Sequence, residues 1–194
     1  MDQVTKAGNP SMSSVAEIRK RARESLDRGA VTAGYDADRA SVVKLLNEAL
    51  ATEIVCVLRY KRHYFMARGI HAESVATEFQ EHADQEMQHA DQIAQRIVQL
   101  QGEPDFRPDS LAARSHAEYV EGRSLSDMIR QDLIAERVAI DSYREMIAYV
   151  GDKDPTTRRL LESILAVEEE HADDLVGLLE VGDKQTPMDA ANDR

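Results

Sequence analysis

Apolar and polar positions alternate with a helical period over most of the chain. Apolar side chains recur every three or four residues across residues 39–68, 73–100, 124–150 and 155–180, and few segments show the two-residue period of a strand. Glycine or proline interrupts the pattern at the ends of these segments. We therefore expect an all-α protein, with a bundle of four long helices over residues 39–181 and with Phe65 on the inner stripe of the first helix.

The segments outside these helices differ in length and composition. Residues 103–123 form the longest connection, and their length fits a crossover along the bundle between the second and third helices. Residues 1–38 are predicted to form an N-terminal arm with a short helix over 13–28, which begins at a capping box of Ser14 and Glu17. Residues 182–194 are mostly polar, and we predict a flexible tail there.

Composition and charge narrow the range of functions. The net charge of −12 disfavours a general nucleic-acid binder and favours the attraction of cations. Cys56 is the one cysteine, so no disulfide can form within the chain and a reducing compartment fits. The N-terminus does not resemble a signal peptide, and no apolar run reaches the length of a membrane span. We expect a cytoplasmic protein with no membrane partner.

The same pattern of carboxylates occurs twice in the predicted bundle. Each half has a Glu-x6-Tyr pair on one helix and a Glu-x-x-His pair on the next. The two copies are Glu53, Tyr60, Glu86 and His89 in the first half, and Glu136, Tyr143, Glu168 and His171 in the second. Residues three or seven positions apart project from one face of a helix. Four helices therefore direct four carboxylates and two imidazoles inward.

A doubled set of this kind is typical of a dinuclear metal site in a carboxylate bundle. Burying a carboxylate is costly unless it is paired or bound to a cation, and Glu53 and Glu136 lie among mostly apolar neighbours. Oxygen ligands with one imidazole per metal and no thiolate suit iron or manganese. A single Glu-x-x-His pair would indicate only a solvated helix face, whereas two copies at matching spacing favour a metal centre.

The residues around this pattern resemble those of bacterioferritins over about residues 42–180. The matching positions are Leu46-Asn47-Glu48, Glu86-Met87-x-His89-Ala90-Asp91, Gly102-x-Pro104, Asp132-Leu133-x-x-Glu136 and Glu168-Glu169-x-His171. The resemblance implies a ferritin-like four-helix bundle with a ferroxidase centre, where dioxygen or peroxide oxidises Fe(II). It also implies storage of the ferric mineral in a hollow homo-oligomeric shell.

The resemblance further implies roles for individual residues. Two iron ions per chain would be held by six ligands, with Glu86 and Glu168 as bridges; the six are Glu53, Glu86, His89, Glu136, Glu168 and His171. Tyr60 would hydrogen-bond a ligand and donate an electron near the irons, which makes it the candidate catalytic residue. For Tyr143 the same role and ordinary core packing both remain open.

Met87 corresponds to the methionine that binds haem in bacterioferritins. The resemblance therefore allows a haem b at a subunit interface, with Met87 from each of two chains as ligand. Because Met87 follows the inward Glu86 by about 100° on the helix, it points sideways toward a neighbour. Methionine is also an ordinary interface residue, so both alternatives stay open.

The cysteine and the other histidines do not belong to the repeated Glu-x6-Tyr and Glu-x-x-His pairs. Cys56 lies one turn after Glu53 and is open to oxidation by peroxide, although packing is the commoner role of a cysteine on an apolar stripe. The remaining histidines are predicted to lie on the surface or beside the metal ligands, with the first of them the best auxiliary candidate; they are His63, His71, His82 and His116.

Two features depart from bacterioferritins and resemble the Dps-like group. The chain has an N-terminal arm, and residues 182–194 do not suit the short fifth helix that lines the channels of a 24-subunit shell. A 12-subunit shell is the alternative, and a DNA-protecting Dps-like mini-ferritin that uses peroxide is the alternative function. Basic and acidic residues nearly balance in the arm, so binding of nucleic acid is not expected. A rubrerythrin-like peroxidase would need cysteine pairs that the chain lacks.

Overall fold

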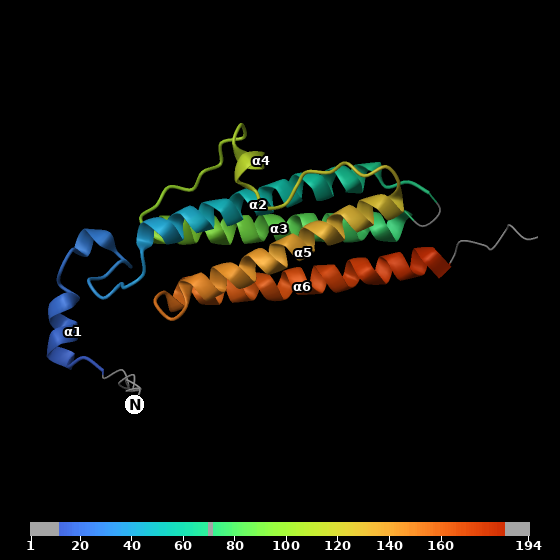
Figure 1. The fold of residues 1–194 in the computed structure, drawn as a ribbon. Coiled ribbons are helices and arrows are strands. Elements are labelled where there is room, and N and C mark those ends of the chain that lie inside the picture. The colour runs from blue at the N-terminus through green and yellow to red at the C-terminus, as the bar shows by residue number, and fades with distance from the viewer. Residues whose placement is uncertain (1–11, 70–71, 185–194) are drawn as a thin grey trace, which may run out of the picture. The chain divides into compact units, whose positions relative to one another are not determined.

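The computed structural model describes residues 12–69 and 72–184 of the chain, which divides after Tyr35 into two compact units. In the second unit, four long helices form a bundle (Figure 1). They are α2 (Arg39–Met66), α3 (Ala72–Gln99), α5 (Leu125–Val150) and α6 (Pro155–Lys184). No strand occurs among the described residues, and the expected all-α fold is confirmed.

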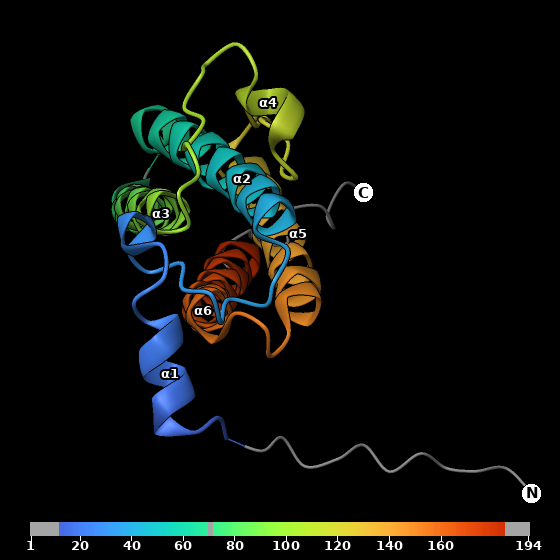
Figure 2. The ribbon, with the colours of Figure 1, turned by 90° about the vertical axis from the view of Figure 1, so that its left-hand side faces the viewer.

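The long helices form two pairs of sequence neighbours. Helix α2 packs along α3, α5 packs along α6, and the pairs meet through contacts of α2 with α5 and of α3 with α6. The view along the bundle in Figure 2 shows the four helices around one interior. Each helix therefore has a face toward a common core, as the helical periodicity predicts.

Local capping signals set the boundaries of these helices. Asp38, Ser124 and Asp154 each accept a hydrogen bond from the backbone N–H three residues later, which satisfies a donor at the start of α2, α5 and α6. Helix α5 ends at Val150 and is capped by Gly151, whose φ of 55° a side-chain-bearing residue rarely adopts. Because these signals are local, the sequence alone predicts the boundaries closely.

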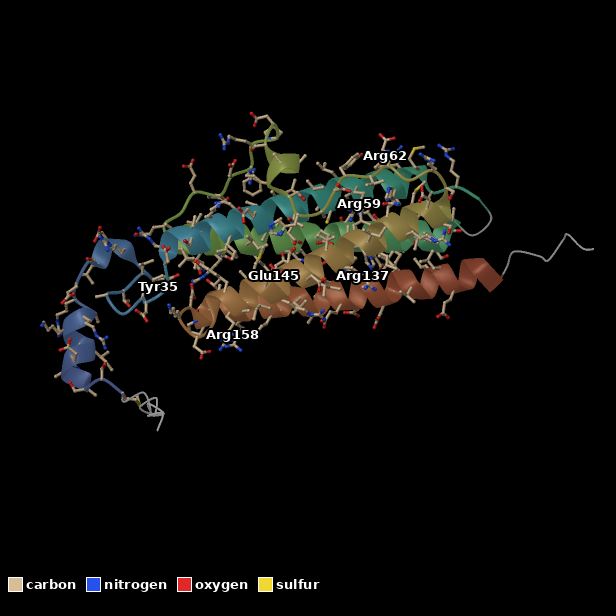
Figure 3. The ribbon with its side chains drawn as sticks, in the orientation of Figure 1. Tyr35, Arg59, Arg62, Arg137, Glu145 and Arg158 are labelled. Carbon is tan, nitrogen blue, oxygen red and sulfur yellow. The ribbon has the colours of Figure 1, made fainter. Side chains whose placement is uncertain are left out.

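The connection between α3 and α5 runs along the bundle and packs on α2, which confirms the expected crossover (Figure 1). It contains one short helix, α4 (Leu111–Arg114). Two arginines of α2, labelled in Figure 3, hold the crossover by its backbone. Arg59 donates to the carbonyl oxygen of Glu118 at 3.0 Å, and Arg62 donates to that of Glu121 at 2.7 Å.

A layer of apolar side chains closes the core on one side of the predicted metal site. Phe79 of α3 and Leu175 of α6 are fully buried there, with Met128 and Ile129 of α5 beside them. Full burial of a side chain such as Phe79 contributes about 1.5–3 kcal/mol to the stability of the fold.

Phe65 of α2, in contrast, is 71% exposed, so its predicted place on the inner stripe of the helix is wrong.

The N-terminal unit is small and contains α1 (Val15–Arg21) and the 3-10 helix η1 (Leu26–Arg28). Ser14 accepts a hydrogen bond from the backbone N–H of Glu17, as the capping box predicts. The helix is shorter than the expected span of 13–28: it ends at Arg21, and the left-handed backbone of Ser25, with φ of 49°, separates it from η1. No residue of α1 is buried.

Two sequence predictions concern the ends of the chain. Helix α6 continues to Lys184, which is beyond the expected start of the tail, and residues 185–194 lie outside the described residues. Residues 1–11 of the arm also lie outside them. Across the described part of the chain, the helices are all too short or too polar to serve as a membrane span.

Candidate metal centre

Six carboxylate and imidazole side chains from the four long helices meet inside the bundle. Helices α2 and α5 each supply one glutamate, and α3 and α6 each supply a Glu-x-x-His pair. At most 5% of each residue is exposed; the six are Glu53, Glu86, His89, Glu136, Glu168 and His171. The structure thus brings together all the residues that the sequence pattern singles out as ligands.

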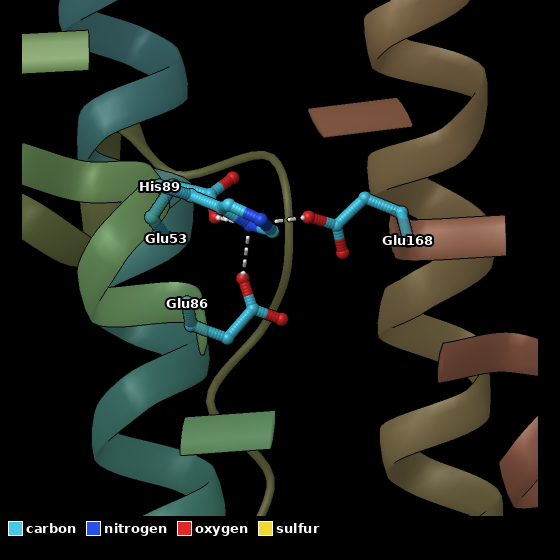
Figure 4. Close-up of side chains that lie close together, drawn as sticks. All are labelled: Glu53, Glu86, His89 and Glu168. Atoms are coloured by element: carbon cyan, nitrogen blue, oxygen red, sulfur yellow. Dashed lines mark ion pairs between the residues drawn. The ribbon is translucent and has the colours of Figure 1, made fainter. Parts of the chain in front are cut away.

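The first half of the cluster surrounds the Nδ1 atom of His89 (Figure 4). This atom lies 2.9 Å from Oε1 of Glu168, 3.3 Å from Oε2 of Glu53 and 3.5 Å from Oε2 of Glu86. The four residues can offer one ligand atom each, and these atoms all lie within 4.8 Å of one another. One metal ion fits a group of this size.

The second half is arranged in the same way around Nδ1 of His171. This atom lies 3.5 Å from Oε1 of Glu86, 3.8 Å from Oε2 of Glu168 and 3.9 Å from Oε2 of Glu136. Glu86 and Glu168 thus belong to both halves, and each directs one oxygen toward each histidine. A carboxylate in this position is suited to bridge two ions.

The two tyrosines of the repeated pattern bind the glutamates crosswise. Tyr60 of α2 donates its hydroxyl proton to Oε1 of Glu136 on α5, and Tyr143 of α5 donates to Oε1 of Glu53 on α2. Each tyrosine thereby fixes one oxygen of a carboxylate and leaves the other oxygen, Oε2, toward the histidines. The alternative left open for Tyr143, packing alone, does not account for this contact.

The centre concentrates buried polar atoms that lack a hydrogen bond. Among the described residues, all such side-chain atoms belong to the six residues of the cluster and to His82. They include both carboxylate oxygens of Glu86 and of Glu168. An unsatisfied buried polar atom destabilises the fold, and these atoms converge on two positions. The donor set therefore fits two bound cations, which would satisfy the atoms together.

Burial and mutual repulsion shift the titration of the centre. Burial, together with the charge of Glu86, raises the pKa of Glu53 and of Glu168 well above the usual range. Burial disfavours the charged form of His89, but hydrogen bonds to Glu168, Glu53 and Glu86 outweigh it and raise the pKa of His89 to about 12. In the metal-free protein, protons thus partly neutralise the carboxylates, and metal binding must displace them.

His82 lies beside the centre, which is one of the two places predicted for the histidines outside the Glu-x-x-His pairs. It is only 2% exposed, its ring stacks on that of His171 with centroids 3.9 Å apart, and its Nδ1 lies 3.2 Å from the hydroxyl oxygen of Tyr60. Burial, followed by the charge of His171, lowers the pKa of His82 to about 3. The available signal was its position two turns before His89 on one helix face.

His63 serves a different part of the fold. Its Nδ1 lies 2.7 Å from Oδ2 of Asp132, and Nε of Arg59 donates to Oδ1 of the same carboxylate at 2.7 Å. These buried groups satisfy one another and join α2 to α5 beneath the crossover. His116 is exposed, as predicted for a surface histidine, and contacts Ser142. His71 lies outside the described residues, so the prediction made for it is not tested.

Met87 and Cys56 each lie close in sequence to a predicted ligand, but Met87 is exposed whereas Cys56 is buried. Met87 is 41% exposed on α3, which agrees with a side chain that points away from the bundle interior. Cys56 is buried against Ala117 and Ala135, and burial raises the pKa of its thiol well above the usual range. A protonated buried thiol reacts slowly, so packing is the better interpretation of Cys56.

Four helices, a long crossover and a doubled Glu-x-x-His set define the class of ferritin-like carboxylate bundles. The family model of the ferritin-like domain matches residues 43–184, and the chain belongs to this family. The bacterioferritin of Mycobacterium bovis is 33% identical over 145 residues, which cover 74% of this chain and 86% of the relative. That of Rhodobacter capsulatus is 29% identical over 151 residues, or 77% and 89% of the two chains.

Solved structures share the fold. A dodecameric thioferritin, the bacterioferritin-related protein from Bacteroides fragilis, superposes with a TM-score of 0.72 at 32% identity and covers 76% of this chain and 90% of its own. Dps from Thermosynechococcus elongatus superposes with a TM-score of 0.70 at 17% identity over 79% of this chain and 96% of its own. At that identity the second likeness shows the fold alone.

Proposed function

We propose that this protein stores iron and oxidises Fe(II) to Fe(III) at a dinuclear ferroxidase centre within its own bundle. The observation that carries the proposal is the placement of Glu86 and Glu168, each of which directs one oxygen toward each histidine. The convergence of unsatisfied buried atoms supports two cations at these positions. The bacterioferritin relatives favour iron as the metal.

Each residue of the centre has a distinct proposed role. Glu53 and His89 hold one Fe(II), Glu136 and His171 hold the other, and Glu86 and Glu168 bridge them. Two Fe(II) give up two electrons. With two protons, these electrons reduce one hydrogen peroxide to two waters, or reduce one dioxygen to one hydrogen peroxide. Carboxylates can shift between terminal and bridging contacts as the charge of the ions rises.

Tyr60 is proposed as the catalytic tyrosine of this centre. Its hydroxyl group holds Glu136, a proposed ligand, in place, and a phenol in direct contact with a ligand could donate an electron to the reaction. Tyr143 makes the equivalent contact with Glu53 and is proposed to position that ligand. The two tyrosines thus fix the two carboxylates that are proposed as the terminal ligands.

Replacing Glu86 tests the catalytic part of the proposal. Glu86→Ala removes a bridge, and we expect at least a 100-fold loss in the rate of Fe(II) oxidation measured by stopped-flow absorbance, with unchanged helicity by circular dichroism. Glu145→Ala is the control, since Glu145 is an exposed glutamate on α5, labelled in Figure 3. Wild-type rates in the Glu86 variant would show that the site is wrongly assigned.

Storage of mineral also requires a closed homo-oligomeric shell. The dodecameric relative supports such an assembly and favours twelve subunits over twenty-four. Large apolar side chains remain exposed on the single chain, among them Leu58 on α2 and Ile134 on α5, and they suit subunit contacts. Light scattering at neutral pH should give the mass of a shell, and a stable monomer or dimer would contradict storage.

A further inference from the structure

We infer that the protein has a third divalent-cation site, formed by Glu78, His82 and Asp174 between α3 and α6. Glu78 and His82 lie one turn apart on α3, and Asp174 reaches them from α6. This site shares no ligand with the dinuclear centre. Its existence does not depend on the proposed function, although its role in handling Fe(II) does.

The distances within the cluster suit one metal ion. Nε2 of His82 lies 3.2 Å from Oε1 of Glu78 and 3.7 Å from Oδ2 of Asp174, and the three ligand atoms lie within 4.8 Å of one another. With metal–ligand bonds of about 2.0–2.2 Å, neighbouring ligand atoms in a coordination sphere lie roughly 3–4 Å apart. An ion can therefore enter with only small side-chain movements.

The hydrogen bonds of His82 leave a lone pair directed into this cluster. Tyr60 has one hydroxyl proton, which it donates to Glu136, so its oxygen accepts a hydrogen bond from the Nδ1–H group of His82. In a neutral imidazole the other nitrogen, Nε2, then carries a lone pair. That atom is buried, has no hydrogen-bond partner, and faces two carboxylates. Three acceptors that point at one another call for a cation.

Exposure differs among the three ligands in a way that suits exchange with solvent. His82 is 2% exposed, whereas the side chains of Glu78 and Asp174 are 29% and 47% exposed. Water can therefore complete the coordination sphere on the outer side. One imidazole with two carboxylates favours Fe(II), Mn(II) or Zn(II) over Ca²⁺ or Mg²⁺, which prefer oxygen ligands alone.

The site is also in contact with the dinuclear centre through His82. The ring of His82 stacks on that of His171, and its Nδ1 is bonded to Tyr60, which in turn holds Glu136. An ion bound here lies at the half-open edge of the cluster, one residue away from two ligands of the centre. If the proposed function holds, this is where Fe(II) pauses before it enters the buried pair of positions.

Zinc binding to the metal-free full-length protein tests the site without any assay of activity. Equilibrium dialysis against Zn(II), with a weak competing chelator, counts the tightly bound ions per chain. Asp174→Ala should bind one ion fewer than the wild type, and Glu78→Ala should give the same loss. Asp173→Ala is the matched control, because it removes a neighbouring exposed carboxylate of α6 and should bind as the wild type does.

The outcomes separate this site from the dinuclear centre. Glu86→Ala should lose the dinuclear ions and keep the ion at His82. A wrong assignment of the dinuclear centre would therefore change the zinc count of the Glu86 variant and leave the difference between the wild type and the Asp174 variant intact. Equal stoichiometry in the wild type and in both the Asp174 and Glu78 variants would overturn the inference. An equal loss in the Asp173 control would overturn it too, since the bound ion would then reflect only the net acidity of the surface.

Discussion

The hydroxyl group of Tyr60 on α2 donates a hydrogen bond to Glu136 on α5, across the bundle interior. The equivalent pair of Tyr143 and Glu53 runs in the opposite direction, so the two halves of the chain exchange tyrosines. Each half on its own would leave its glutamate without this partner. The crossed pairs therefore link the correct docking of α2 against α5 to the geometry of the metal centre.

Removal of one hydroxyl group should weaken the centre without abolishing it. Tyr60→Phe keeps the ring but frees Oε1 of Glu136, and we expect Fe(II) oxidation to slow by about 10–100-fold, the usual cost of losing a partner of a metal ligand. Stopped-flow absorbance at two Fe(II) per chain measures the rate. Tyr149→Phe is the control, because Tyr149 is 58% exposed on α5. Equal rates in both variants would exclude a role for the Tyr60 hydroxyl.

Metal binding should stabilise the folded protein. A ligand that binds only the native state at 100 times its Kd adds about 2.7 kcal/mol to the free energy of unfolding, and for a chain of this length each kcal/mol raises Tm by about 2–4 °C. We therefore expect Zn(II) to raise the Tm of the metal-free protein by roughly 5–10 °C in differential scanning calorimetry. Glu86→Ala should lose most of that rise. An unchanged Tm in the wild type would contradict a buried metal centre.

Met87 provides a test for haem. If two copies of Met87 bind one haem b across a twofold interface, protein reconstituted with haem should show a Soret band that Met87→Leu removes, because leucine keeps similar bulk but has no thioether. Ferroxidation should stay nearly unchanged. Met66→Leu is the control, since Met66 is 43% exposed on α2. A reconstituted wild type without a Soret band would leave Met87 as an interface side chain.

The sequence predicts the helices well because their signals are local. Asp38, Ser124 and Asp154 cap helices whose observed starts lie within one or two residues of those expected. The metal cluster is equally visible, since Glu-x-x-His pairs repeat at helical spacing. Periodicity fails for Phe65, which lies at the last turn of α2, where the stripe no longer meets the core.

The remaining features depend on tertiary contacts that spacing does not encode. The sequence places Tyr60 and Tyr143 near the ligands, but only the docking of α2 against α5 shows which carboxylate each one binds. On α3 both Glu78 and Glu86 lie four residues from His82, so spacing alone does not show which of them His82 faces, and Asp174 joins Glu78 and His82 only because α6 packs beside α3. The sequence of the arm also predicts a helix, but no residue of α1 is buried, so packing does not determine how long that helix is.

The positions of bound iron ions locate the metal centre directly. Crystals of the full-length protein soaked in Fe(II) without oxygen, and measured at the iron absorption edge, give an anomalous map that locates each ion. Besides any ion at Glu78, His82 and Asp174, we expect two peaks per chain inside the bundle, one beside Glu53 and His89 and one beside Glu136 and His171, with Glu86 and Glu168 between them. A single peak among these residues, or iron bound only elsewhere, would contradict a dinuclear ferroxidase centre.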